Sequence, residues 1–185
     1  ALHLLETIRY HSISCDEYTK VGHTMDSTPF GLFITWTVYG TFLPGDVRGW
    51  RHRGRGNQAP RPPLDIWHLN RLNHRIVTLT KPMREVVDAA VREICQVRSW
   101  TLWSVSSRSN HVHVVVTAPN YKPILVRDQL KAKATRDLRQ SFHVWKGRPV
   151  WSAKGDIEYL DSELEVEQCV AYVQEAQDRM GRDNL

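Results

Sequence analysis

Hydrophobic and polar residues follow strand-like spacing in three parts of the chain. Residues 31–42 are rich in β-branched and aromatic side chains and run into a Pro-Gly-Asp turn, which predicts a buried strand. Residues 100–107 and 111–117 alternate around the tight connection 108–110, so we expect an antiparallel pair. Val150-Trp151 and residues 157–160 are typical of a short last strand pair.

Apolar residues recur at helical spacing in three further segments. The pattern predicts helices over residues 81–98 and 123–142, the second with a strongly basic polar side. Ser162 and Glu165 have the spacing of a capping box, which predicts a last helix over about residues 163–180.

The resulting order is strand, helix, strand, strand, helix, strand, helix. This order indicates an α+β fold, a ferredoxin-like split β-α-β sandwich whose mostly antiparallel sheet has helices on one face, plus a C-terminal helix. We expect an N-terminal extension over residues 1–28 and one domain over residues 29–181. Met25 is a possible alternative start.

Residues 44–68 interrupt this pattern with four glycines, four prolines and several arginines. Such a composition favours neither helix nor strand, so we expect a basic loop inserted into the domain. A solvated insertion without a binding role is an equally good interpretation.

Composition narrows the function only a little. The net charge of +5 and the pI near 9.3 suit a polyanionic partner. Three scattered cysteines favour neither a disulfide framework nor a CxxC zinc site. No run of about 18 apolar residues and no signal-peptide core are present, so we expect no membrane association and a cytoplasmic protein.

The segment His111-Val112-His113 carries the first candidate chemistry. Side chains alternate across a strand, so the two imidazoles share one face and the valines share the other. We expect the valine face to pack under the helices and the histidine face to be the open side of the sheet, where an imidazole pair can hold a metal. By spacing alone, the more common interpretation would be two histidines without a metal on a partly solvent-exposed strand.

Four segments together resemble one known family. NHVHVVV (110–116) resembles the His-hydrophobic-His signature of the single-tyrosine HUH transposases, which include the insertion-sequence-200-like and REP-associated tyrosine transposases. LKAKATRDL (130–138), IEYLDSELEVEQCVAYVQEAQ (157–177) and FITWTVYGTFLPGD (33–46) are similar to that family's helix after the signature, its tyrosine helix and its opening strand. The resemblance covers roughly residues 30–180.

The resemblance implies a role for each part of the site. Tyr172 would be the nucleophile, and His111 and His113 would bind Mg²⁺ or Mn²⁺. The substrate would be single-stranded or hairpin DNA, cut through a 5′-phosphotyrosine without a nucleotide cofactor. The protein would be a homodimer whose last helix can complete the partner's active site, and it would associate with the nucleoid when bound to DNA.

The third metal ligand departs from the family pattern. Ala176 stands one turn after Tyr172, so the available amides are Gln174 and Gln177. On an ideal helix Gln177 lies about 140° around from Tyr172, and both can face the sheet only if the helix is locally irregular. We choose Gln177 because it falls in the apolar stripe of the helix; an inward glutamine bonded to backbone is the alternative.

Cationic and aromatic side chains are the candidates for contacting DNA. Exposed Trp50 or Trp67 can stack on unpaired bases, whereas Trp36, Trp100 and Trp103 lie in strands and are expected in the core. The candidates for phosphate contacts come from the basic loop and the second helix: Arg48, Arg51, Arg53, Arg55, Lys131, Lys133 and Arg136.

Two competing functions stay open. A ferredoxin-like module derived from a transposase would bind nucleic acid without cutting it, and Ala176 is its best support. In that case Tyr172 would only pack at a helix edge. A histidine-metal hydrolase of another kind is disfavoured, because no HExxH motif or carboxylate cluster accompanies the histidine pair.

Overall fold

A four-stranded antiparallel sheet is the centre of the protein. The computed structural model describes residues 29–52 and 54–176. Strands β1 (Gly31–Thr37), β4 (Thr101–Ser107), β5 (His111–Thr117) and β6 (Asp156–Leu160) lie in the order β4-β5-β1-β6. β1 therefore has a partner on each side, and its buried residues Leu32, Ile34 and Trp36 lie in the middle of the core.

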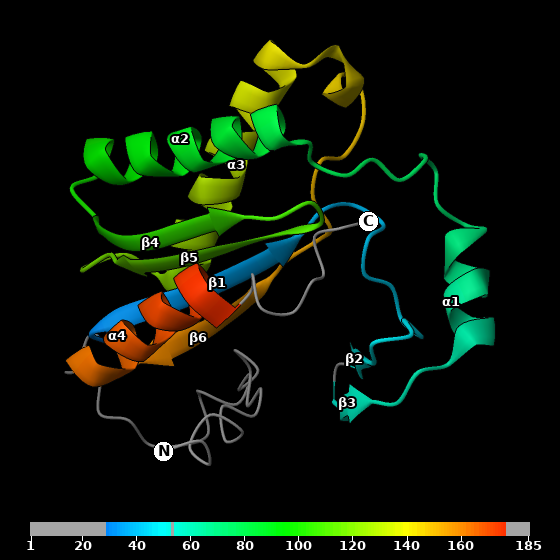
Figure 1. Ribbon diagram of the computed structural model, residues 1–185, viewed down its shortest axis with the longest axis horizontal. Coiled ribbons are helices and arrows are strands. Elements are labelled where there is room, and N and C mark those ends of the chain that lie inside the picture. The colour runs from blue at the N-terminus through cyan, green and yellow to red at the C-terminus, as the bar shows by residue number, and fades with distance from the viewer. Residues whose placement is uncertain (1–28, 53, 177–185) are drawn as a thin grey trace.

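Two long helices cover one face of this sheet (Figure 1). Helix α2 (Lys81–Val97) and helix α3 (Pro123–Ser141) pack on the face that carries Val112, Val114 and Val116. All three valines are fully buried. With β1, this βαββαβ order confirms the expected ferredoxin-like α+β fold and the predicted valine face.

The opposite face, which carries the histidines, is covered as well. Helix α4 (Glu163–Ala171) continues into a π-helical turn (Tyr172–Ala176) and lies across this face (Figure 1). Val166 and Val173 pack there against Val115 of β5. The expectation of an open histidine face is therefore wrong: the apolar stripe of the last helix needs a surface to pack on, and this face supplies it.

Helix α4 begins at the predicted capping residue. The Ser162 hydroxyl accepts a hydrogen bond from the Glu165 amide at 3.3 Å, and the Glu165 carboxylate accepts one from the Asp161 amide at 2.7 Å. The first bond satisfies an amide that the first helical turn leaves without an intrahelical partner, and the second ties the residue before the cap to the same turn. The predicted residues after 176 lie outside the described part of the chain.

A basic arm, which we define as residues 44–75, stands beside the sheet (Figure 1). It contains a hairpin of β2 (Trp50–His52) and β3 (Gly56–Gln58) and the short helix α1 (Pro62–Leu69). The expectation of neither helix nor strand in this segment is wrong. Pro62 and Pro63 occupy the first helical turn, where a missing N–H costs nothing, and Gly54 turns the hairpin with a φ of 85°.

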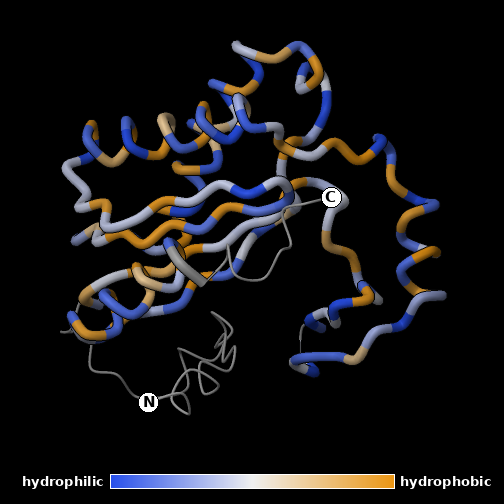
Figure 2. The backbone as a smooth tube through the Cα atoms, in the orientation of Figure 1, coloured by the Kyte–Doolittle hydropathy of each residue, from blue (hydrophilic) through white to orange (hydrophobic). Residues whose placement is uncertain are grey.

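The arm is attached to the body at both ends. The Arg48 guanidinium donates to the Thr41 carbonyl at 3.0 Å, and the Asn73 amide donates to the Tyr39 hydroxyl at 3.2 Å. No residue of α1 is buried, although hydrophobic positions recur along it (Figure 2). Packing on the sheet therefore does not account for the apolar side chains of this helix.

The last predicted strand pair does not form as a hairpin. Trp151 makes a single antiparallel bridge with Val38, and β6 pairs along β1 instead of with residues 150–151. A short 3-10 helix (His143–Trp145) precedes this segment. Across residues 29–52 and 54–176, no helix combines the length and apolar character needed to cross a membrane.

Candidate active site

The two histidines of β5 lie side by side on the face covered by α4. Their ring centroids are 4.6 Å apart. His113 is 4% exposed, whereas His111 at the end of the strand is half-buried. Alternation of side chains thus brings both imidazoles to one place, as the sequence predicted.

Hydrogen bonds orient both rings through the same nitrogen. The Nδ1 of His111 lies 2.6 Å from Oδ1 of Asn110, and the Nδ1 of His113 lies 2.8 Å from Oγ1 of Thr35. An amide oxygen only accepts, so the His111 Nδ1 donates to it, and in the neutral ring this places the lone pair on Nε2. Nδ1 bonds to oxygen are the usual arrangement behind histidines that bind metal through Nε2.

Burial keeps His113 neutral. Burial is the largest cause that lowers the pKa of His113 to about 3, and the nearby ionisable side chains of His111 and Arg108 contribute to the same shift. A neutral imidazole is the form that binds a metal ion.

Tyr172, at the end of α4, lies close to the histidine pair of β5. Its ring centroid lies 6.1 Å from that of His113 and 6.2 Å from that of Phe33, both edge to face. Phe33 stacks on His113 at 5.3 Å. The three rings therefore form one aromatic group that links the last helix to the sheet.

The helix is irregular at Tyr172. The π turn, with i→i+5 hydrogen bonds, begins at Tyr172, and such single turns occur often at functional sites. Gln177, five residues after Tyr172, lies outside the described residues. Gln174 is exposed and lines a hollow with Trp103 and Val170. Within the described chain, no group of three His, Cys, Asp or Glu side chains is arranged to hold a metal.

Sequence reasoning missed three residues that shape this site. Asn110 and Thr35 hold the imidazoles, and Phe33 packs against one of them. Thr35 pairs directly with His113 in the β1–β5 register, and Phe33 pairs with Val115. Asn110 belongs to the quoted signature segment, but only the register between strands 78 residues apart could have identified Thr35.

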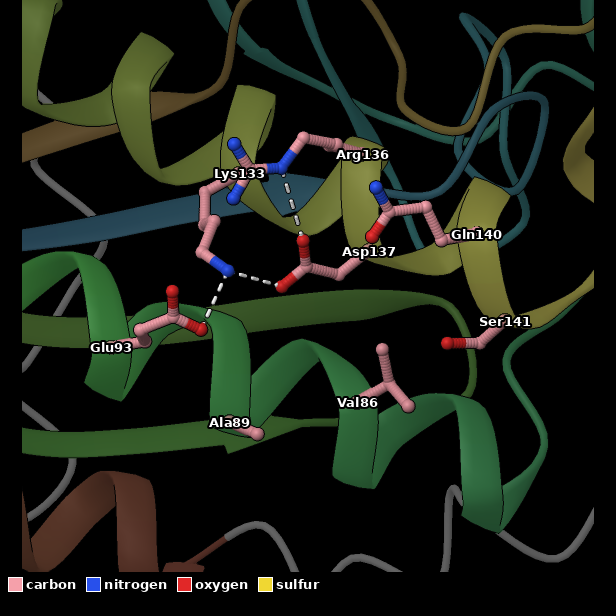
Figure 3. A pocket seen from close by; sticks show the side chains of 8 residues that line it. All are labelled: Val86, Ala89, Glu93, Lys133, Arg136, Asp137, Gln140 and Ser141. Carbon is pink, nitrogen blue, oxygen red and sulfur yellow. Dashed lines mark hydrogen bonds and ion pairs between the residues drawn. The ribbon is translucent and has the colours of Figure 1, made fainter.

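Three of the predicted phosphate contacts are engaged inside the protein. Arg48 forms an ion pair with Asp46 at 2.7 Å, and Lys131 donates to the Ser152 carbonyl at 2.9 Å and to the Lys154 carbonyl. Lys133 lies between Glu93 and Asp137, at 2.6 Å from each (Figure 3). Helix α3 also packs on the face opposite the histidines.

The other candidates are more accessible. Arg55 is exposed, Arg51 is half-buried in β2, and the Arg136 side chain is 62% exposed beside Asp137. Arg53 lies outside the described residues. Their contacts with DNA remain predictions.

The division of the tryptophans into buried and exposed side chains differs from the expectation at one position. Trp36 and Trp100 are buried as expected, but Trp103 is 41% exposed. Trp103 sits at an irregularity in the β4–β5 register, where an extra residue turns its side chain out of the regular alternation. In the arm, Trp67 is 49% exposed and Trp50 is half-buried.

Comparison with known protein families identifies the family of this chain. A family model described as "Transposase IS200 like" matches residues 66–176, from the end of α1 through the π turn. The chain belongs to the IS200-like transposase family. This confirms the resemblance found in the sequence. β1 lies outside the matched range although it supplies Thr35, so the folded unit of this chain begins before residue 66.

Two solved structures resemble the chain at low sequence identity. One is a REP-associated tyrosine transposase bound to a REP hairpin, with 10% identity, a TM-score of 0.50, and coverage of 86% of this chain and 74% of that one. The other was assigned as a transposase from Deinococcus radiodurans R1, with 12% identity, a TM-score of 0.47, and coverage of 87% and 95%. No curated protein matches the sequence. The first likeness supports the fold.

Proposed function

We propose that this protein cuts and rejoins single-stranded DNA by metal-dependent attack of Tyr172 on a phosphodiester. One observation carries the proposal: the π turn brings the Tyr172 ring to 6.1 Å from that of His113, which is paired with His111 on the same face. A nucleophile beside a histidine pair in a transposase family fits a DNA-cleaving HUH-type enzyme.

The reaction exchanges one phosphodiester for another. The Tyr172 oxygen forms a bond to phosphorus, the bond to the 3′-oxygen breaks, and the phenolic proton is balanced by protonation of that oxygen. The products are a 5′-phosphotyrosine and a free 3′-hydroxyl. Attack by a 3′-hydroxyl on the phosphotyrosine reverses the step, so strands are rejoined without a nucleotide cofactor.

His111 and His113 would hold a divalent ion through Nε2, since the Nδ1 of each ring is hydrogen-bonded to an oxygen. We assign Gln177 as the third ligand, since the i→i+5 turn that starts at Tyr172 favours residues five apart on one side. Mg²⁺ or Mn²⁺ bound there would neutralise charge on the scissile phosphate and on the leaving oxygen.

We assign hairpin DNA with single-stranded flanks as the substrate, because a structural neighbour was solved with a REP hairpin. The proposed unit is a homodimer, and Tyr172 can then act in its own subunit or in the partner. The catalytic domain spans residues 29–181. The protein would act in the cytoplasm, on the nucleoid.

Covalent trapping tests the nucleophile. With a labelled hairpin oligonucleotide and Mn²⁺, wild-type protein should give a protein–DNA adduct on denaturing gels, and Tyr172→Phe should give none while folding and binding DNA normally. Tyr159→Phe is the matched control, because it removes the same hydroxyl group from a tyrosine in β6 that is not the proposed nucleophile, and it should leave the adduct unchanged. An adduct on another tyrosine would overturn the assignment of Tyr172 and leave the reaction type intact.

The metal is tested separately. Replacing His111 and His113 by alanine should abolish both adduct formation and Mn²⁺ binding in calorimetry. Unchanged Mn²⁺ affinity in this double variant would contradict the proposed metal site.

A non-cleaving DNA-binding module is the second candidate. Its support is Ala176, which stands one turn after Tyr172 where the family pattern has a polar side chain. Absence of any adduct with Mn²⁺ or Mg²⁺, combined with tight DNA binding, would select this function.

A further inference from the structure

Helix α1 presents apolar side chains that packing does not explain. Ile66 is 56% exposed and Trp67 is 49% exposed, and the helix has no buried residue. Because about half of Trp67 stays exposed, folding buries only part of its apolar surface. Its side chain is available for a partner.

Trp67 is already held from one side by a cation. The Arg71 guanidinium lies 3.6 Å from the centroid of the Trp67 ring, and its Nη1 donates to the Trp67 carbonyl at 3.2 Å. His68 contacts the indole edge to face at 4.8 Å. These contacts restrict the ring, which lowers the entropy that a stacked ligand must overcome.

The arm that carries Trp67 also holds the charge excess of the chain. Residues 44–75 contain seven arginines, no lysine and two aspartates, a net charge of +5. The whole chain has the same net charge of +5, so the remainder is neutral overall. A polyanion would therefore be attracted to the arm more than to the body.

The arm starts at the histidine end of the sheet. Thr37, the last residue of β1, pairs with His111, and the chain then enters the arm. The Thr41 hydroxyl donates to the Asn110 carbonyl at 3.0 Å, directly before His111. A strand bound along the arm would thus be led toward the histidine pair.

We propose that Trp67, backed by Arg71, is a stacking platform for an unpaired base of the single-stranded DNA that flanks the cleavage site. The inference rests on the proposed function for its substrate class. An indole face beside arginines matches a nucleotide with an open base face and a phosphate. Bases in a duplex are stacked on each other and offer no such face.

Binding to a fluorescent dT20 strand tests the platform. Measured without metal in a Tyr172→Phe background, Trp67→Ala should weaken binding between about 5-fold and about 100-fold. Trp67→Phe should recover most of this loss, because an aromatic face remains. An oligonucleotide of the same length with abasic sites should bind wild type and Trp67→Ala equally.

Salt dependence separates stacking from charge. Trp67→Ala should leave the slope of log affinity against log salt unchanged, whereas Arg71→Ala should reduce it by about 0.7. Two matched controls are Trp103→Ala, an exposed tryptophan outside the arm, and Lys133→Ala, a cation paired with Glu93 and Asp137. Neither should change dT20 affinity.

Several outcomes would overturn the platform. Wild-type dT20 affinity in Trp67→Ala would do so, as would an equal loss in Trp103→Ala. A change of oligomeric state in Trp67→Ala with normal DNA binding would instead make α1 a protein interface. The covalent adduct assay on wild-type protein tests the cleavage reaction separately from the platform. If wild type forms the adduct but Trp67→Ala binds dT20 normally, only the platform is refuted. If Trp67→Ala loses dT20 affinity but wild type forms no adduct, only the cleavage reaction is refuted.

Discussion

Hydrogen bonds to Asn110 and Thr35 orient the two imidazoles of the site through Nδ1. The Nδ1 atoms of His111 and His113 are both occupied by oxygen partners, at 2.6 Å and 2.8 Å. Partners of this kind orient the ring, and in metal sites their loss typically reduces metal affinity by about 10-fold to 100-fold. These two residues are therefore positioning residues for the proposed metal site.

Asn110→Ala should raise the Mn²⁺ concentration needed for half-maximal adduct formation by about 10-fold to 100-fold. Saturating Mn²⁺ should restore most of the adduct, because the ligands themselves remain. The measurement is a Mn²⁺ titration of covalent complex on denaturing gels. Gln140→Ala, on the far side of the protein in α3, is the control. An unchanged Mn²⁺ requirement in Asn110→Ala would show that Asn110 does not orient His111.

Sequence could identify the histidine pair but not the partners of individual charges. Alternation along one strand places His111 and His113 together, and that needs only local information. The sequence predicts Lys133 as a DNA contact because its partner Glu93 is 40 residues away and comes close only when α2 and α3 pack. Residue-level roles that depend on two elements were therefore the least predictable.

At the scale of elements, the position of Tyr172 depends on how α4 packs across the sheet. Val166 is 1% exposed and faces β1 at Gly31, where a Cβ atom would lie 2.9 Å from a Val166 methyl group. Such a distance requires one of the two elements to move. The absence of a side chain at Gly31 thus allows α4, and with it Tyr172, to lie close to the histidines.

Gly31→Ala should reduce adduct formation more than it reduces dT20 affinity, because it displaces the helix that carries Tyr172 and leaves the arm intact. Adding Val166→Ala removes the clashing methyl groups and should recover part of the adduct. Adduct yield and dT20 binding are measured for both single variants and the double variant. A double variant no better than Gly31→Ala would contradict this steric explanation.

Helix and strand periods predicted most elements because those periods are local. The segments 81–98, 111–117 and 123–142 differ from α2, β5 and α3 by no more than a residue at an end. Two failures have physical causes. The many glycines and prolines of residues 44–68 led to the prediction of a loop, although the segment contains the short β2–β3 hairpin and α1. Alternation along β5 carries no information on α4, which covers the histidine face. The sequence allowed Tyr172 and Gln177 to face the sheet together only if the helix is locally irregular, and a π turn is present at Tyr172.

For the whole molecule, charge and packing are divided between two parts. The core lies between the sheet and its helices, while the arm supplies a net charge of +5 and little burial. A family match that starts at residue 66 includes neither β1 nor most of the arm. Domain boundaries drawn from the match alone would therefore remove a strand from the centre of the sheet.

A fragment of residues 66–185 should fail to fold, whereas a fragment of residues 29–185 should unfold cooperatively with nearly the full-length Tm. Without β1, strands β5 and β6 lose their shared partner. Leu32, Ile34 and Val38 at this strand are at most 3% exposed. Burying three such aliphatic side chains contributes roughly 5–9 kcal/mol, about as much as the whole stability of a typical domain. Far-UV circular dichroism with thermal and urea melts measures both fragments. Cooperative unfolding of 66–185 would show that β1 is dispensable, and a clear loss of Tm in 29–185 would show that the domain extends into residues 1–28.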